Sequence, residues 1–348
     1  MQLLEEYKSD MRKLKTLLER GVDYRTVAAI LAQSQYILKD YPDERKYCFA
    51  YSKAVKDIAL RQYAETLKPE WDEMYWQAML WEAPMLLDSY CLYIEKNRKP
   101  QERFYQPRRK TLKRVVDKLQ ALEDDELDEL FIHMPARVGK SQIITLGTSW
   151  HCGRDTEKSN LYVTYKEGLG GAFLDGVMEI WTDPTYCHND VFQHKVARTD
   201  AKNHKVDLDR KKKYATLSGK GLESGLNGEY DAYGWLILDD ILEGIQDVLN
   251  PDILRRKQIV FDNNVMMRKK EQCKLILNGT IWSLHDLYMD RLNFLQSNPE
   301  AQNIRYDILK IPALDPITDE SNFDYDYGVG FTTQYYRTVR AKFEENDD

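Results

Sequence analysis

The segment from residue 130 to residue 150 constrains the fold of this chain more than any other. Residues 130–134 (LFIHM) form an apolar run that is long enough for one buried strand. The loop Met-Pro-Ala-Arg-Val-Gly-Lys-Ser follows at residues 134–141, and residues 141–150 (SQIITLGTSW) are predicted to form a helix. A strand, a loop and a helix in this order are typical of loops that bind phosphate groups. The departure is Met134, which stands where such a loop has its first glycine.

The residue types at the end of this loop suit phosphate chemistry. Gly139 lets successive backbone N–H groups face a polyphosphate, and Lys140 supplies a charge for its β- and γ-phosphates. Ser141 offers a hydroxyl to Mg²⁺, and the helix that starts here carries a partial positive charge at its N-terminus. A Gly-Lys-Ser triplet can also occur by chance on a surface turn, but the flanking strand and helix disfavour that alternative. We therefore expect a nucleotide to contact Pro135, Ala136, Arg137, Val138, Gly139, Lys140, Ser141 and Gln142.

An apolar strand that ends in two acidic residues is the second chemical signal. Residues 235–240 read Trp-Leu-Ile-Leu-Asp-Asp. We expect Asp239 to hold Mg²⁺ through water and Asp240 to polarise an attacking water molecule. Glu243 is a rival for the second role, because its side chain is one methylene longer. A strand that simply runs into a polar turn is a common alternative, but the loop at residues 134–141 favours the magnesium site.

The chain divides into two regions by its pattern of apolar residues. Residues 1–100 show helical spacing at 3–18, 27–38 and 76–94, with breaks at Gly21 and at residues 41–43. From residue 101 to residue 340, short apolar runs alternate with helical and polar stretches, which predicts an α/β domain with a mainly parallel sheet. The predicted strands are residues 130–134, 160–165, 235–239 and 274–279, with a further one at 304–311.

Charge and composition exclude some classes of protein. The formal net charge of −7 argues against a histone-like coat of positive potential. Basic clusters at residues 108–110, 210–213, 255–257 and 268–270 could still follow a phosphate backbone, although each could equally be a solvated helix end or loop. The five cysteines and six histidines show no metal-ligand spacing, which indicates reduced thiols in a cytosolic compartment. No apolar run approaches the roughly 20 residues that span a bilayer.

Taken in order, these elements resemble the large terminase subunits of tailed bacteriophages, the ATPases that drive genome DNA into a preformed capsid. The resemblance covers residues 101–340 and depends on several segments in the same order. They are 103–107 (RFYQP), 134–141, 162–165 (YVTY) with the helix that contains Phe173, 183–186 (DPTY), 214–221 with the glycine-rich 225–228 (GLNG), 235–240, 278–282 (NGTIW) with 285–287, and 311–314 with 330–333.

The resemblance implies a P-loop ATPase of the ASCE/RecA-like type, with a mainly parallel central sheet and a helical region before it. It implies that Tyr105 stacks on adenine, that Gln106 reads the adenine edge, and that Thr280 senses the γ-phosphate and relays its loss to the part that grips DNA. Lys140 and Arg137 would neutralise charge on the γ-phosphoryl group.

A ring ATPase commonly takes a further arginine from a neighbouring subunit. Arg198 and Arg210 are candidates for this role in trans, and Arg137 could serve in cis. The choice among them stays open at the level of sequence.

The same resemblance implies a biological setting. The domain would couple Mg-ATP hydrolysis to the movement of double-stranded DNA into a procapsid, in the cytoplasm of an infected bacterium and away from any membrane. Its partners would be the portal protein, the small terminase subunit and further copies of itself in a homo-oligomeric ring, a pentamer at the portal. Residues 341–348 would begin a linker to a nuclease domain that this chain lacks, so no nuclease activity is expected from it.

Two other functions fit part of the pattern. A helicase-like DNA-remodelling ATPase would share the glutamine, the loop, the acidic strand and the threonine, but would need a second paired domain. A regulatory or adaptor protein could bind ATP without hydrolysing it. The helical region at residues 1–100 could dock on a partner, grip DNA or buttress the ATPase core as a lid, and the last is favoured.

Overall fold

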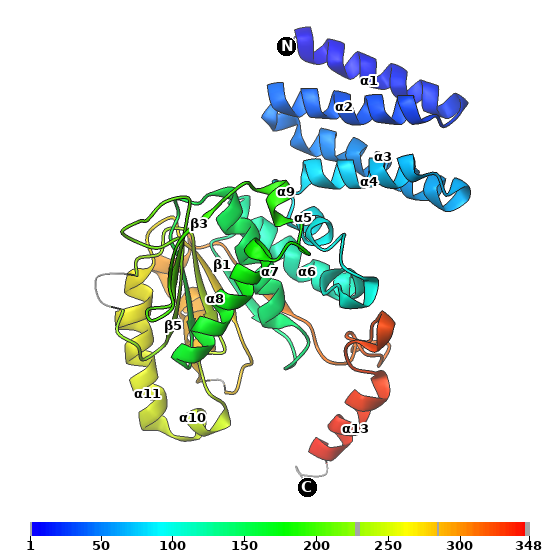
Figure 1. Ribbon diagram of the computed structural model, residues 1–348. Coiled ribbons are helices and arrows are strands. Elements are labelled where there is room, and N and C mark those ends of the chain that lie inside the picture. Colours follow the sequence, from blue (N-terminus) through cyan, green and yellow to red (C-terminus); the bar gives the residue numbers. More distant parts are fainter. Residues whose placement is uncertain (1, 227–229, 284, 345–348) are drawn as a thin grey trace. The chain divides into compact units, whose positions relative to one another are not determined.

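The computed structural model describes residues 2–226, 230–283 and 285–344, and it shows an α/β protein (Figure 1). The chain forms two compact units, residues 1–93 and residues 94–348. Two predicted features fall partly outside the described residues: Asn227 and Gly228 of the glycine-rich stretch, and residues 345–348 of the expected linker. Residues 341–344 of that linker belong to the last helix.

The first unit consists of helices that pack on their neighbours in the chain. Its core contains Met11, Val27, Ile30, Val55 and Trp71, each from an apolar helix face. The helices are α1 (Gln2–Arg20), α2 (Tyr24–Asp40), α3 (Arg45–Thr66), α4 (Pro69–Glu82) and α5 (Leu87–Ile94), with a short 3₁₀ turn at Pro42–Glu44.

The helix boundaries in this unit follow local sequence signals. The predicted breaks at Gly21 and at residues 41–43 are confirmed, and Asp23 caps α2 by accepting from the backbone N–H groups of Arg25 and Thr26. The stretch with helical spacing at 76–94 belongs to two helices, because α4 ends at Glu82 and a turn precedes α5. Pro84 lies in that turn, where its ring and missing N–H group oppose a continuous helix.

The second unit is built around one sheet. Among the described residues this sheet has eight strands in the order β3-β4-β5-β2-β6-β7-β1-β8, and all neighbours are parallel except β3-β4 and β4-β5. The strands are β1 (Glu129–His133), β2 (Asn160–Thr164), β3 (Val196–Asp200), β4 (Lys205–Leu208), β5 (Leu217–Gly221), β6 (Trp235–Asp239), β7 (Lys274–Asn278) and β8 (Tyr306–Lys310).

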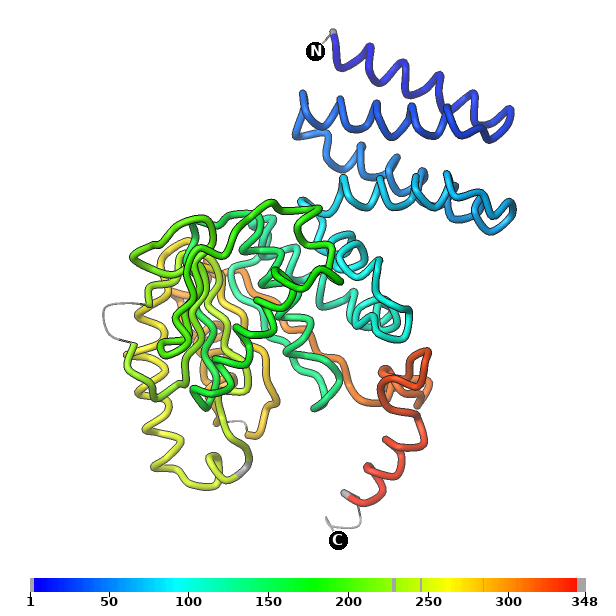
Figure 2. The backbone as a smooth tube through the Cα atoms, in the orientation of Figure 1, coloured from blue at the N-terminus to red at the C-terminus, as the bar shows by residue number. Residues whose placement is uncertain are grey.

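Helices cover both faces of this sheet, and Figure 2 shows α7 and α11 on opposite sides of it. One face packs on α11, α12 and the π-helical turn at Phe261–Val265 through a single apolar cluster. The helices are α6 (Tyr105–Glu123), α7 (Lys140–Arg154), α8 (Glu167–Thr182), α9 (His188–Val191), α10 (Ile245–Leu249), α11 (Pro251–Val260), α12 (Leu287–Ser297) and α13 (Thr333–Glu344), with 3₁₀ turns at Pro100–Glu102, Met266–Arg268, Pro299–Ala301 and Asp326–Gly328.

All five predicted strands are present, at nearly the predicted positions. Four of them, β1, β2, β6 and β7, are recognisable because strands buried on both faces read as continuous apolar runs. The fifth, β8, lies at the edge of the sheet and is buried only at Leu309. Strands β3, β4 and β5 were not predicted. Their sequences (VARTD, KVDL and LSGKG) mix charges and glycine into short segments, so no apolar run marks them.

The register of the central strands places the candidate site. Asn278 at the end of β7 pairs with Ile132 of β1 on one side and with Asp239 of β6 on the other. Because the three strands are parallel, their carboxyl ends lie at the same edge of the sheet. The loop after β1, the acids after β6 and Thr280 after β7 therefore meet there.

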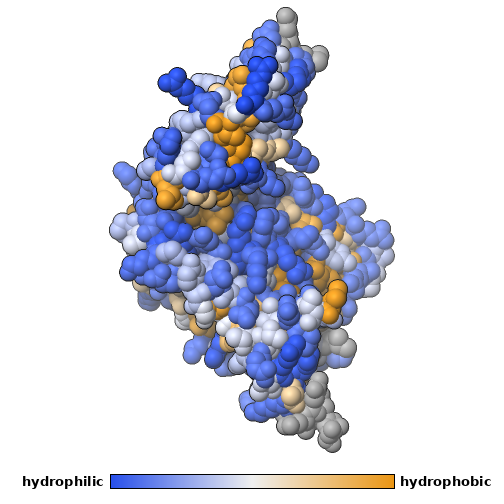
Figure 3. Space-filling view, turned by 90° about the vertical axis from the view of Figure 1, so that its right-hand side faces the viewer, coloured by the Kyte–Doolittle hydropathy of each residue, from blue (hydrophilic) through white to orange (hydrophobic). Residues whose placement is uncertain are grey.

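The surface of the molecule is mainly polar on the face shown in Figure 3, where hydrophobic residues form small separate groups. Within the residues that the structure describes, no helix combines the length and the apolar character needed to cross a bilayer.

Candidate functional site

The loop between β1 and α7 turns at its second half. Gly139 has φ +97° and Arg137 has φ +63°, so both occupy the left-handed region. A Cβ atom on Gly139 would also lie 2.8 Å from the ring of Phe104. Met134 and Val138 are buried and anchor the loop to the core, whereas Ala136 and Arg137 are exposed. Met134 does not have a positive φ, so the backbone at this position does not require glycine.

Lys140 contacts two other predicted site residues, Thr280 and Asp240. Its side chain is only 5% exposed, and its Nζ donates to Thr280 Oγ1 at 3.2 Å and lies 3.6 Å from Asp240 Oδ1. These residues come from the start of α7 and from the segments after β7 and β6. Asp240 has φ +43° and a side chain that is 46% exposed, so its carboxylate can reach solvent.

Asp239 lies behind Asp240 and is almost fully buried. Its Oδ2 accepts from Tyr162 Oη at 2.7 Å, and its Oδ1 accepts from Asn278 Nδ2 at 2.7 Å. Burial raises the pKa of Asp239 above its ordinary value and the charge of Asp240 raises it further, while a hydrogen bond from Ser141 acts in the opposite direction. The site therefore holds a carboxylate whose charge is incompletely balanced by the protein.

The donor set fits Mg²⁺. Asn278 Oδ1 is buried without a hydrogen-bond partner beside Asp239, so acceptors exceed donors at this point. No group of three or more His, Cys, Asp or Glu residues suited to a metal occurs in the described part of the chain. Mg²⁺ does not need one, since it usually binds one or two carboxylates and completes its shell with water and phosphate oxygens. Ser141 and Asp239 are the residues that would hold it.

The segment after β7 is held from several directions. His133 Nδ1 lies 3.1 Å from the carbonyl oxygen of Gly279, which can only accept, so Nδ1 carries the proton. Burial lowers the pKa of His133, which favours this neutral form. Asp286 accepts from the N–H groups of Trp282 and Met289 at 2.9 and 3.0 Å. Thr280 is thus flanked by contacts at Gly279 and at Trp282.

Tyr288 connects that segment to the acids. Its hydroxyl donates to the Asn278 carbonyl at 3.2 Å and accepts from the Ile241 N–H group at 3.2 Å. The Asp240 N–H group donates to the same Asn278 carbonyl at 2.9 Å. The backbone after β6 therefore cannot shift without affecting the end of β7.

A cavity of about 450 Å³ lies beside the acids, between α7 and α8. Its lining includes the stacked rings of Tyr162 and Phe173, 3.7 Å apart between centroids, together with Ser141, Asp239 and Asp240. Gln142, predicted to contact nucleotide, also lines this cavity.

The predicted adenine contacts are placed differently from expectation. Tyr105 is completely buried at the start of α6, so its ring cannot stack on a base in this conformation. The buried Glu95 fixes this start by accepting from the N–H groups of Phe104 and Tyr105 at 2.8 and 2.9 Å. Phe104 is the aromatic ring beside Gly139. Gln106 is exposed and accepts from Arg103.

Other predicted residues lie apart from Lys140. Glu243 is exposed, and its N–H group donates to Asp247 at 2.7 Å. Arg198 lies on β3 at the far edge of the sheet, where it pairs with Asp200 at 3.2 Å, and Arg210 after β4 pairs with Glu157. Pro135, half-buried, completes the loop. The sequence interpretation gave no separate role to Tyr162, Tyr288 or Asp286. The roles of Tyr162 and Tyr288 depend on contacts with residues far away in the chain. Asp286 instead makes local contacts as the N-cap of α12, a position that local sequence signals can indicate.

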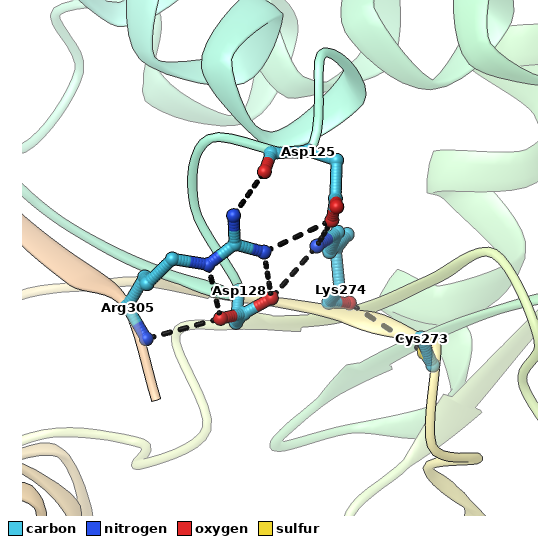
Figure 4. Close-up of polar contacts among 5 residues, drawn as sticks. All are labelled: Asp125, Asp128, Cys273, Lys274 and Arg305. Carbon is cyan, nitrogen blue, oxygen red and sulfur yellow. Dashed lines mark hydrogen bonds and ion pairs between the residues drawn. The ribbon is translucent and has the colours of Figure 1, made fainter. Parts of the chain in front are cut away.

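A different kind of polar cluster lies at the amino edge of the sheet, where the parallel strands begin (Figure 4). Arg305 makes a two-pronged contact with Asp128, at 2.9 and 2.8 Å, and also pairs with Asp125 at 3.0 Å. Lys274 reaches the same two aspartates at 2.5 and 2.8 Å. Hydrogen bonds from Arg305 hold the pKa of Asp128 far below its ordinary value. This cluster ties together the amino ends of β1, β7 and β8.

Comparisons with known proteins leave the family open, since no family model matches the sequence and no curated protein matches it.

Proposed function

We propose that this chain is a Mg²⁺-dependent ATPase of the ASCE/RecA-like class and acts as the motor domain of a viral DNA-packaging terminase. The observation that carries the proposal is the position of Lys140, whose Nζ lies 3.2 Å from Thr280 Oγ1 and 3.6 Å from Asp240 Oδ1. These groups lie at the carboxyl ends of the central strands, next to the buried Asp239. The strand order supports it, because β7 with its threonine lies between the loop strand β1 and the acidic strand β6.

Phosphate binding follows from the start of α7. The loop N–H groups and the N-terminus of this helix, which spans Lys140–Arg154, favour negative charge, and Lys140 adds a buried cation. Ser141 and Asp239 would hold Mg²⁺, which when bound bridges phosphate oxygens and neutralises their developing charge. The exposed Arg137 extends from the loop toward solvent, where it can meet the γ-phosphoryl group or a neighbouring subunit.

Asp240 is the proposed general base or water-positioning group. Its carboxylate lies next to Lys140 and opens to solvent and to the adjoining cavity, so a water molecule can reach both it and the phosphate. Glu243 is placed less favourably, since its backbone is bound to Asp247 and its side chain is exposed. Thr280 would report the loss of the γ-phosphate through its contact with Lys140.

DNA movement and the partners are proposed from the ordered resemblance to terminases. Double-stranded DNA, the portal protein, the small terminase subunit and a ring of copies of this chain belong to that proposal. The basic clusters give it limited support, because several of their cations already have partners. Lys257 pairs with Asp247 at 2.5 Å, and Arg268 and Lys270 both pair with Asp231, at 3.4 and 2.8 Å.

The deciding experiment is phosphate release from ATP by the purified chain, with and without linear duplex DNA and over a range of protein concentrations. We expect Mg²⁺-dependent turnover that rises with DNA and with concentration, as ring assembly requires. ATP binding without phosphate release would reduce the proposal to a nucleotide-binding adaptor. Turnover that is the same with and without DNA would support an ATPase but contradict the role as a packaging motor.

A further inference from the structure

Tyr162 reaches the buried carboxylate of Asp239 from the neighbouring strand. In the parallel register Tyr162 of β2 pairs with Ile237 of β6, and Asp239 lies two residues further along on the same face of the sheet. The Tyr162 hydroxyl donates to Asp239 Oδ2 at 2.7 Å, while Asn278 Nδ2 occupies Oδ1 at the same distance. Two neutral donors from two strands therefore fix the plane of this carboxylate.

The position of this hydroxyl is set by α8 rather than by the acid. The ring of Tyr162 lies flat on Phe173 of α8, with centroids 3.7 Å apart and planes 7° from parallel. Both rings are buried and form a wall of the 450 Å³ cavity that also contains Ser141 and Asp240. The phenol cannot follow Asp239 if the carboxylate rotates, because the stack holds its ring.

We propose that Tyr162 is a positioning residue that sets the Mg²⁺ affinity of the site, an inference that rests on the proposed function. An ionised carboxylate offers about four acceptor positions. Tyr162 and Asn278 each occupy one, which leaves the rest for Ser141 or for a water molecule on the ion. Holding the carboxylate in one orientation before binding keeps those positions directed at the ion.

The size of the effect follows from other metal sites. Partners that hydrogen-bond to a metal ligand commonly change metal affinity by about 10- to 100-fold when they are removed. Tyr162→Phe removes only the hydroxyl and keeps the ring that stacks on Phe173. Tyr165→Phe is a matched control, because Tyr165 lines the same cavity but its hydroxyl makes no hydrogen bond to Asp239 in the described structure.

The test measures metal affinity directly, with the whole chain and with Mn²⁺ as a probe for Mg²⁺. Free and bound Mn²⁺ are counted by electron paramagnetic resonance at a saturating concentration of ADP, and the affinity for ADP is measured separately in EDTA. We expect Tyr162→Phe to weaken Mn²⁺ binding by about 10- to 100-fold and to leave ADP affinity in EDTA unchanged. Tyr165→Phe should behave like the wild type in both measurements.

The results distinguish an error in the inference about Tyr162 from an error in the proposed function. Unchanged Mn²⁺ affinity in Tyr162→Phe overturns the inference, and so does an equal loss of ADP affinity with and without metal, since that indicates a merely structural role. A wild-type chain that binds ADP in neither condition overturns the proposed function itself. If Tyr162→Phe does not fold, Phe173→Leu decides, because it keeps the hydroxyl but frees the ring. Weaker Mn²⁺ binding with normal ADP binding in EDTA would then support the inference, and unchanged binding would overturn it.

Discussion

Carboxylates lie in opposite electrostatic environments at the two ends of the parallel strands, here called the amino edge and the carboxyl edge of the sheet. At the amino edge, Asp128 is paired with Arg305 and Lys274, and its pKa is held low. At the carboxyl edge, Asp239 is buried and accepts from neutral donors beside a second carboxylate, and its pKa is raised although the cation of Lys140 acts in the opposite direction. At the amino edge, cations of the chain itself balance the carboxylates. At the carboxyl edge, negative charge is left over that a bound cation could balance. This difference distinguishes a candidate binding site from a structural cluster.

The largest effect should come from the exposed acid at the carboxyl edge. Asp240→Asn keeps the shape of the side chain but removes its basicity, so we expect ATP turnover to fall by about 10²- to 10⁴-fold. Glu243→Gln should change turnover little. Phosphate release from the two purified variants makes the comparison. Full activity in Asp240→Asn, together with loss in Glu243→Gln, would exchange the two assignments.

Lysines at the two edges provide the next test. Lys140→Ala removes a buried cation next to Thr280 and Asp240, and we expect turnover to fall by about 10²- to 10³-fold, as for loss of a preorganised donor to developing charge. Lys274→Ala removes a lysine of the same sheet whose partners are Asp125 and Asp128, and turnover should be unchanged. Equal losses in both variants would mean that stability, and not the site, explains the effect.

Asp239→Asn should separate stability from function. The amide removes a buried charge that Asp240 repels, and Asn278 can turn its unpartnered Oδ1 toward the new NH₂ group. Without metal or nucleotide, we expect the free energy of unfolding in urea to rise by about 0.5–2 kcal/mol, while Mg²⁺-dependent nucleotide binding is lost. A clear loss of stability would show that the carboxylate is already well compensated, contrary to the comparison.

The smallest effect is expected at the amino edge, and its pH dependence has a definite sign. The folded-state pKa of Asp128 lies below its value in the unfolded chain, so its ion pairs stabilise the fold above the unfolded pKa, about 3.9, and this contribution is lost as the pH falls through the folded pKa. Asp128→Asn should therefore lower stability at pH 7 by no more than about 1 kcal/mol.

Urea unfolding at pH 7 and at pH 3 checks this expectation, with ATP turnover at pH 7 as the control. The difference between Asp128→Asn and the wild type should shrink at pH 3, and turnover should not change. A difference that grows as the pH falls would contradict the direction of the shift.

Much of the central sheet was predictable because its strands are buried on both faces. The apolar runs at β1, β2, β6 and β7 marked their positions, and the loop after β1 and the acids after β6 followed directly. The strands β3 and β4 carried no such signal, since they are short and contain charged residues. The helical spacing at 76–94 did not show that the stretch is divided between two helices, although Pro84 in the turn between them is a local signal for such a break.

The sequence by itself determined the α/β class, the strand–loop–helix unit at 130–150 and the residue types for a nucleotide site, because these depend on local patterns of a few neighbouring residues. Only the tertiary structure decided which of those residues meet. It brought Lys140 to Thr280 and Asp240, placed Tyr105 in the core, and gave Asp239 its donors Tyr162 and Asn278. These contacts depend on strand order and register, which join residues far apart in the chain and which no local pattern specifies.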